Sequence, residues 1–94
     1  MLEVKLIADP GISASVIEKT CAGLGLQTSM KGVTKTLPPN IHWHFKRGEE
    51  KGVLEITLLL ETNEIILSCK ENRKADWVID IMGKLKREFS SQLN

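Results

Sequence analysis

Two histidines separated by one residue lie in the stretch NIHWHFKR, residues 40–47. Alternate side chains of a β-strand point to the same side, so His42 and His44 would present both imidazoles on one face, about 6.5–7 Å apart along the strand. This geometry suits two metal ligands, but a catalytic zinc site needs at least a third protein ligand. Only Glu55 is expected nearby, so we predict no metal site and no cofactor, with a metal-dependent site at these three residues as an alternative.

A small-molecule site, if the chain has one, is expected on the same face. Its candidate residues are His42, His44, Glu55, Thr57, Ser68 and Lys70. A carboxylate beside His44 would favour the protonated imidazole, so we expect the pKa of His44 to lie above the ordinary value of about 6.5. The chain has neither a Gly-x-Ser-x-Gly nucleophile motif nor a P-loop, and the sequence favours a protein that is not an enzyme.

Three predicted strands, about 41–47, 52–60 and 64–70, must position these residues. The links between them are short, so both are predicted hairpins, and the strands form an antiparallel meander. Alternation places Ile41, Trp43 and Phe45 on a dry face and the histidines on the opposite, open face. The proposed roles of the histidines depend on this assignment of faces.

Pairing like faces with each other predicts the register of the meander. The expected rows across the open face are His44–Glu55–Lys70, His42–Thr57–Ser68 and Leu59–Ile66. Val53, Leu59 and Ile66 would add apolar area to this face, which suits contact with a partner or a second copy of the chain. The main hypothesis is therefore a small non-catalytic binding or assembly module that uses the open face, with an unknown partner and a homodimer as one option.

The remaining segments predict a single α+β domain over residues 1–94. A strand at about 2–8 precedes a helix at about 12–24, and apolar residues at helical spacing indicate a second helix at about 73–93. Residues 26–36 are expected to form a strand or strand pair with a bulge or turn at Gly32. The order β-α-β-β-β-β-α predicts a two-layer sandwich, in which both helices cover one face of a mostly antiparallel sheet. The positions of the first strand and of residues 26–36 in the sheet stay open.

A basic middle segment supports a second hypothesis, nucleic-acid (RNA) binding. No acidic residue occurs between Glu18 and Glu49. The candidate contacts are Lys46, Arg47, Lys70, Arg73 and Lys74. The last three surround the expected start of the second helix, where free backbone N–H groups attract phosphate.

The order helix, three strands, helix over residues 12–93, with basic residues entering the last helix, is similar in outline to a double-stranded-RNA-binding domain. The stretch NRKADWVID differs from the lysine- and alanine-rich helix entry of that family, because Asp76 and Asp80 intrude. The resemblance is therefore one of outline and rests on no specific motif.

Composition sets the wider limits. The chain has 13 basic and 12 acidic residues and a net charge of +1, which gives no general attraction to nucleic acid or to a membrane surface. Cys21 and Cys69 lack a Cys-x-x-Cys spacing and are expected to be buried thiols in a reducing compartment. No signal peptide and no membrane span are evident, so we expect a cytoplasmic protein.

Overall fold

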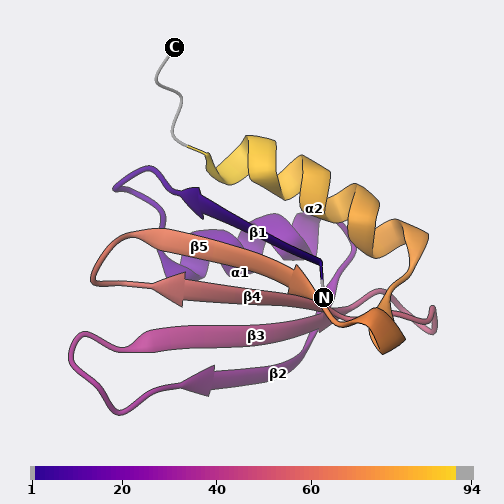
Figure 1. Ribbon diagram of the computed structural model, residues 1–94, viewed down its shortest axis with the longest axis horizontal. Coiled ribbons are helices and arrows are strands. Elements are labelled where there is room, and N and C mark those ends of the chain that lie inside the picture. The colour runs from indigo at the N-terminus through magenta and orange to yellow at the C-terminus, as the bar shows by residue number, and fades with distance from the viewer. Residues whose placement is uncertain (1, 91–94) are drawn as a thin grey trace.

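A five-stranded antiparallel sheet with two α-helices on one face forms the fold (Figure 1). The computed structural model describes residues 2–90. The elements are β1 (Leu2–Ile7), α1 (Ala14–Gly23), β2 (Gln27–Val33), β3 (Asn40–Lys46), β4 (Leu54–Leu59), β5 (Glu64–Cys69), a short 3-10 helix (Glu71–Arg73) and α2 (Asp76–Phe89). The predicted α+β class and the order β-α-β-β-β-β-α are confirmed, and residues 26–36 contribute one strand.

The strands lie in the order β1-β5-β4-β3-β2, and every neighbouring pair is antiparallel. β1 and β2 are therefore the two edges, although only α1 separates them in the sequence. α1 carries the chain from one edge to the other across a single face of the sheet (Figure 1). This long connection explains why local sequence pattern could not place either edge strand.

The start of α1 and the position of the bulge in β2 both differ from the prediction. The Ser13 hydroxyl accepts a hydrogen bond from Val16 N–H at 3.3 Å and caps α1, which begins at Ala14. The expected bulge lies in β2 between Thr28 and Met30, and Gly32 pairs regularly. Ser29 occupies the bulge, and its hydroxyl donates to the carbonyl oxygen of His44 at 3.1 Å.

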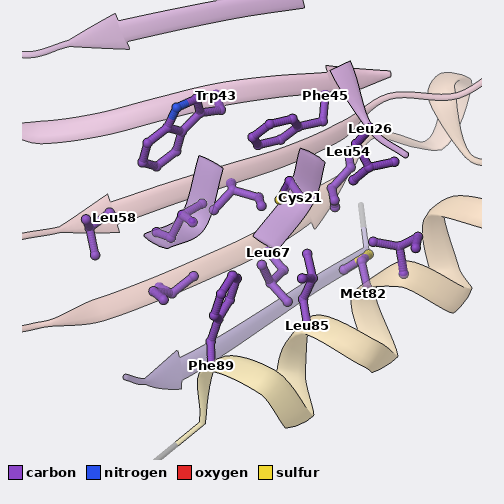
Figure 2. Close-up of a cluster of buried hydrophobic side chains, with 14 of the residues drawn as sticks. Cys21, Leu26, Trp43, Phe45, Leu54, Leu58, Leu67, Met82, Leu85 and Phe89 are labelled. Atoms are coloured by element: carbon purple, nitrogen blue, oxygen red, sulfur yellow. The ribbon is translucent and has the colours of Figure 1, made fainter. Parts of the chain in front are cut away.

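The alternation predicted for the meander is confirmed. Ile41, Trp43 and Phe45 are buried beneath the helices, and the Trp43 side chain is fully enclosed. Figure 2 shows how this sheet face meets side chains of both helices, including Cys21 and Phe89. Burial of this apolar surface is the main stabilising contribution, at roughly 25 cal/mol per Å² removed from water.

The register is right for one hairpin and wrong for the other. His42 pairs with Thr57 and His44 with Glu55, as predicted. β5 is displaced by two residues, so Glu55 lies opposite Ser68 instead of Lys70. The reason is the turn, in which Leu60 leaves the strand and Asn63 adopts a left-handed conformation with φ of 58°. A shift of two preserves the faces and changes only the neighbours.

α2 begins later and ends earlier than predicted. Its first residue is Asp76, because residues 71–73 form a separate 3-10 turn and Ala75 is extended. The backbone N–H of Val53 donates to the carbonyl of Arg73 at 3.1 Å and ties this turn to the start of β4. α2 ends at Phe89, and the rest of the predicted helix, residues 91–93, lies outside the described residues.

Neither α-helix of residues 2–90 combines the length and apolar character needed to cross a lipid bilayer. Cys21 and Cys69 are buried and free, as expected for core thiols.

Candidate functional site on the open face

The open face is the side of the sheet opposite the two helices. Its rows are Met30–His44–Glu55–Ser68–Glu3, Gly32–His42–Thr57–Ile66–Lys5 and Asn40–Leu59–Glu64–Ile7. Within residues 2–90, neither α-helix lies on this side. The sequence prediction included the meander residues of these rows, but it lacked the contributions of β1 and β2.

Three side chains on this face converge and are here called the His–Glu cluster: His42, His44 and Glu55. Glu55 Oε1 lies 3.3 Å from His42 Nε2 and 3.7 Å from His44 Nε2. The two imidazoles meet edge to face, with ring centroids 5.1 Å apart. One donor atom from each residue falls within 4.8 Å of the others, so these are the residues that could hold a metal ion. The register predicted Glu55 beside His44, and the structure also brings His42 to the same carboxylate.

Glu55 is buried although it lies on the uncovered side of the sheet. The residue is 6% exposed, and its neighbour Ser68 is 7% exposed. Among the described residues, Glu55 Oε2 has no hydrogen-bond partner. An ionised carboxylate removed from water without full compensation is costly, so this side chain is not explained by fold stability.

Thr57 orients one of the imidazoles. The Nδ1 atom of His42 lies 2.7 Å from the Thr57 hydroxyl oxygen. When Nδ1 carries the proton and donates to this oxygen, Nε2 keeps its lone pair on the side of Glu55. The predicted pairing of His42 with Thr57 therefore positions the ring as well as the strand.

The expected rise in the pKa of His44 is wrong. Burial lowers the pKa of His44 below 6.5, and this effect outweighs the opposing attraction of Glu55. The positive charges of His42, Arg73 and Lys70 lower it further. The His44 side chain is only 21% exposed. The prediction failed because the position of His44 in a strand on the open face did not reveal this loss of hydration.

An apolar stripe crosses the other end of the open face and consists of Ile7, Ile66 and Leu59. Ile7 is 59% exposed, while Ile66 and Leu59 are half-buried. Leu59 and Ile7 both pair with Glu64, which lies between them, and Ile66 in the next row is the diagonal neighbour of both. Val53, predicted as a third member, precedes β4 at its opposite end and does not belong to this stripe.

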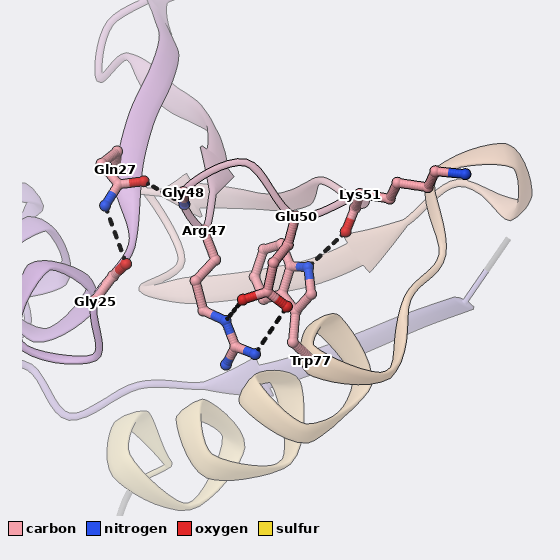
Figure 3. A network of polar contacts seen from close by, with 7 residues as sticks. All are labelled: Gly25, Gln27, Arg47, Gly48, Glu50, Lys51 and Trp77. Atoms are coloured by element: carbon pink, nitrogen blue, oxygen red, sulfur yellow. Dashed lines mark hydrogen bonds and ion pairs between the residues drawn. The ribbon is translucent and has the colours of Figure 1, made fainter.

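Two of the basic residues predicted to bind phosphate contact acidic neighbours. Arg47 makes a two-pronged contact with Glu50 and lies 5.5 Å from the Trp77 ring (Figure 3). Lys74 is 3.5 Å from the carboxylate of Glu71. The other three residues predicted to bind phosphate lie at the ends of elements: Lys46 ends β3, Lys70 follows β5, and Arg73 ends the 3-10 helix before α2.

The start of α2 is also unfavourable for phosphate. Arg73 and Lys74 both precede α2, whose first turn carries Asp76. A negative side chain in that turn competes with an anion for the free backbone N–H groups.

The two thiols take no part in the open face. Burial raises the pKa of Cys21 to about 12, and burial also raises the pKa of Cys69, which Glu55 raises further. Both belong to the core cluster beneath the helices. Their thiols are therefore poor nucleophiles at neutral pH, and they lie on the opposite side of the sheet from the imidazoles.

Sequence reasoning missed one polar link that positions the histidine strand. The buried Trp43 indole N–H donates to Glu18 Oε2 at 2.9 Å, and Lys31 Nζ lies 2.7 Å from the same oxygen. Glu18 thus joins α1 to β3 and β2, and both contacts lower its pKa.

Comparison with protein-family models, with curated proteins and with solved structures found no significant match to this chain. A function for the chain therefore rests on the geometry of its own residues.

Proposed function

We propose that the protein is a small non-catalytic assembly module that pairs with a second copy of itself through the open face. The observation that carries this proposal is the apolar stripe Ile7–Ile66–Leu59 on the side of the sheet that the helices leave uncovered. Apolar side chains that solvent can still reach on an uncovered sheet face are typical of interaction surfaces.

The charges beside the stripe favour a second copy as the partner. Lys5 pairs with Ile66 on one side of the stripe, and Glu64 lies between Leu59 and Ile7. A two-fold interface must be complementary to itself. Two copies of this face can place stripe against stripe while Lys5 of each meets Glu64 of the other, because the face carries both signs of charge.

The size of the face supports a weak and reversible dimer. Five strands about 4.8 Å apart and six residues long, at about 3.3 Å per residue, give a flat footprint of about 24 by 20 Å. This is roughly 480 Å² per copy, less than the 800 Å² or so of a standard stable interface. Full burial of Leu59 and Ile66 would contribute at most about 1.5–3 kcal/mol each before the costs of association.

Sedimentation velocity over a concentration series in the presence of EDTA tests the proposal. The parent should show a reversible monomer–dimer equilibrium, and Leu59→Lys should be monomeric with an unchanged far-ultraviolet circular dichroism spectrum. The matched control is Ile79→Lys, which places the same charge at an exposed apolar position on α2. A parent that stays monomeric at its highest soluble concentration, or a dimer that Leu59→Lys leaves intact, contradicts the proposal.

Nucleic-acid binding has less support, because Arg47 and Lys74 both contact acidic neighbours. It makes a separate prediction, which is steeply salt-dependent binding that weakens on Lys74→Glu. A gel shift with single- and double-stranded RNA and DNA at low salt measures this directly.

The free, buried thiols of Cys21 and Cys69 support a reducing compartment, and the cytoplasm is the location that we propose.

A further inference from the structure

We propose that His42, His44 and Glu55 bind one divalent transition-metal ion of the zinc type on the open face. Two imidazole nitrogens and one carboxylate form a ligand set that zinc and ferrous sites use. The inference goes beyond the assembly role, since the site lies within one chain and needs no second copy.

The positions of the donors carry the first part of the argument. His42 and His44 are two residues apart on β3, and Glu55 lies directly opposite His44 on β4. All three therefore come from one hydrogen-bonded pair of strands, which is a more rigid support than a loop. Zinc bonds of about 2.0–2.2 Å in tetrahedral geometry place neighbouring donors roughly 3.3–3.6 Å apart. The separations of 3.3 and 3.7 Å from Glu55 Oε1 to the two Nε2 atoms are close to that spacing, and the three donor atoms all lie within 4.8 Å of one another.

The state of Glu55 is the second and independent observation. Its carboxylate is more than nine-tenths buried, and among residues 2–90 nothing donates a hydrogen bond to Oε2. Buried charges in proteins are normally paired or coordinate a metal. A cation held between this carboxylate and the imidazoles would compensate the charge that the surrounding side chains leave uncompensated.

A second layer of contacts around the cluster has the form expected of a metal centre. Metal-binding histidines commonly donate their other ring N–H to a nearby oxygen, which fixes the tautomer and the ring orientation. The Thr57 hydroxyl oxygen, 2.7 Å from His42 Nδ1, is placed to accept such a bond. With the proton on Nδ1, the lone pair of His42 Nε2 faces Glu55.

The ligand set also predicts selectivity and an open position. Two nitrogen donors favour zinc, cobalt or nickel over magnesium and calcium, which prefer oxygen ligands. Three protein donors leave a fourth position for water or a small anion, on a side of the sheet that the helices do not cover.

Isothermal titration of the full chain with Zn²⁺ alone, after removal of metal by a chelator, tests the site. We expect one ion per chain, and a loss of affinity of at least tenfold in each of His42→Ala, His44→Ala and Glu55→Gln. These are the only two histidines of the chain, so no other imidazole can substitute. The matched control is Glu3→Gln, an exposed acid in the same row of the open face, which should leave the affinity unchanged.

Two further measurements keep the result unambiguous if a variant folds poorly. Co²⁺ bound to the parent should give visible d–d absorption without a thiolate charge-transfer band, since Cys21 and Cys69 lie in the core. Mg²⁺ and Ca²⁺ should give no saturable heat. A thiolate band, binding that survives His42→Ala/His44→Ala, or no saturable Zn²⁺ binding by the parent would each overturn the site.

The metal site and the dimer can fail separately. Leu59→Lys should remain able to bind Zn²⁺ with parental affinity, because Leu59 lies outside the cluster. The dimer is measured with EDTA present. An absent dimer with intact Zn²⁺ binding therefore removes the assembly proposal alone, and the reverse result removes the metal site alone.

Discussion

Replacing Glu55 by glutamine should stabilise the metal-free protein, although the substitution removes a side chain from the centre of the sheet. Glu55 has a side chain 7% exposed and an Oε2 atom without a hydrogen-bond partner among the described residues. A buried polar group left unsatisfied costs about 1–3 kcal/mol, and more when it is charged. Glutamine keeps the shape and removes the charge, but its amide still requires partners, so only part of that cost is recovered.

We therefore expect the free energy of unfolding to rise by about 1 kcal/mol, which corresponds to an increase in Tm of about 4–8 °C for a domain of this size. Thermal and urea unfolding followed by circular dichroism would measure the change, at pH 8 and with EDTA present. That pH lies above the ordinary imidazole pKa of about 6.5, and burial lowers the pKa of His44 further, so this histidine carries no charge that could balance the carboxylate.

The control for this prediction is Glu3→Gln, which removes the same charge from an exposed position in the same row and should change stability by less than about 0.5 kcal/mol. A loss of 1 kcal/mol or more in Glu55→Gln alone would refute the reasoning. Glu55 would then be a stabilising member of the sheet, and its burial would no longer point to a ligand.

Three further predictions concern the scaffold. Glu18→Ala should cost about 1 kcal/mol at pH 7, because the Trp43 indole N–H loses its acceptor. The pKa of Glu18 lies below its ordinary 4.5, so its carboxylate stabilises the fold above that pH, and urea unfolding should show the difference from the parent shrinking between pH 5 and 3. Gly52→Ala should lower the free energy of unfolding by about 2 kcal/mol or more, and with it the Tm. The φ of Gly52 is +111°, and an added Cβ would lie 2.8 Å from a side-chain carbon. A variant that unfolds at the parental Tm would contradict this. Phe89→Ala should lower the free energy of unfolding, measured in urea, by about 3–5 kcal/mol, because Phe89 is fully buried. Ile79→Ala, on the exposed side of α2, should lower it by less than about 0.5 kcal/mol. Equal losses in the two variants would contradict the assignment of Phe89 to the core.

The faces of the meander were predictable because side chains alternate strictly along a strand. Ile41, Trp43 and Phe45 needed a dry surface, and that requirement alone placed the histidines on the other side. The same logic could not determine the β4–β5 register, since a shift of two residues keeps every face unchanged. Only the turn conformation, with Asn63 at positive φ, selects one of the two alternatives.

The candidate site was predictable in its residues and not in its physical state. Pairing of His44 with Glu55 followed from the first hairpin, whose register was correct. Burial of Glu55 and the lowered pKa of His44 depend on how closely neighbouring side chains enclose them, which local pattern does not report. The contributions of Lys5 and Ile7 to the same face required the position of β1, which is set by packing beyond the reach of sequence periodicity.

The bulge at Ser29 has a consequence for how the molecule behaves at high concentration. β2 is an outer strand, and an uninterrupted outer strand is a template to which further chains can add without limit, as in fibrils. The extra residue breaks the regular spacing of backbone donors and acceptors that an incoming strand would have to match. Growth of the sheet in its own plane is therefore discouraged at this border.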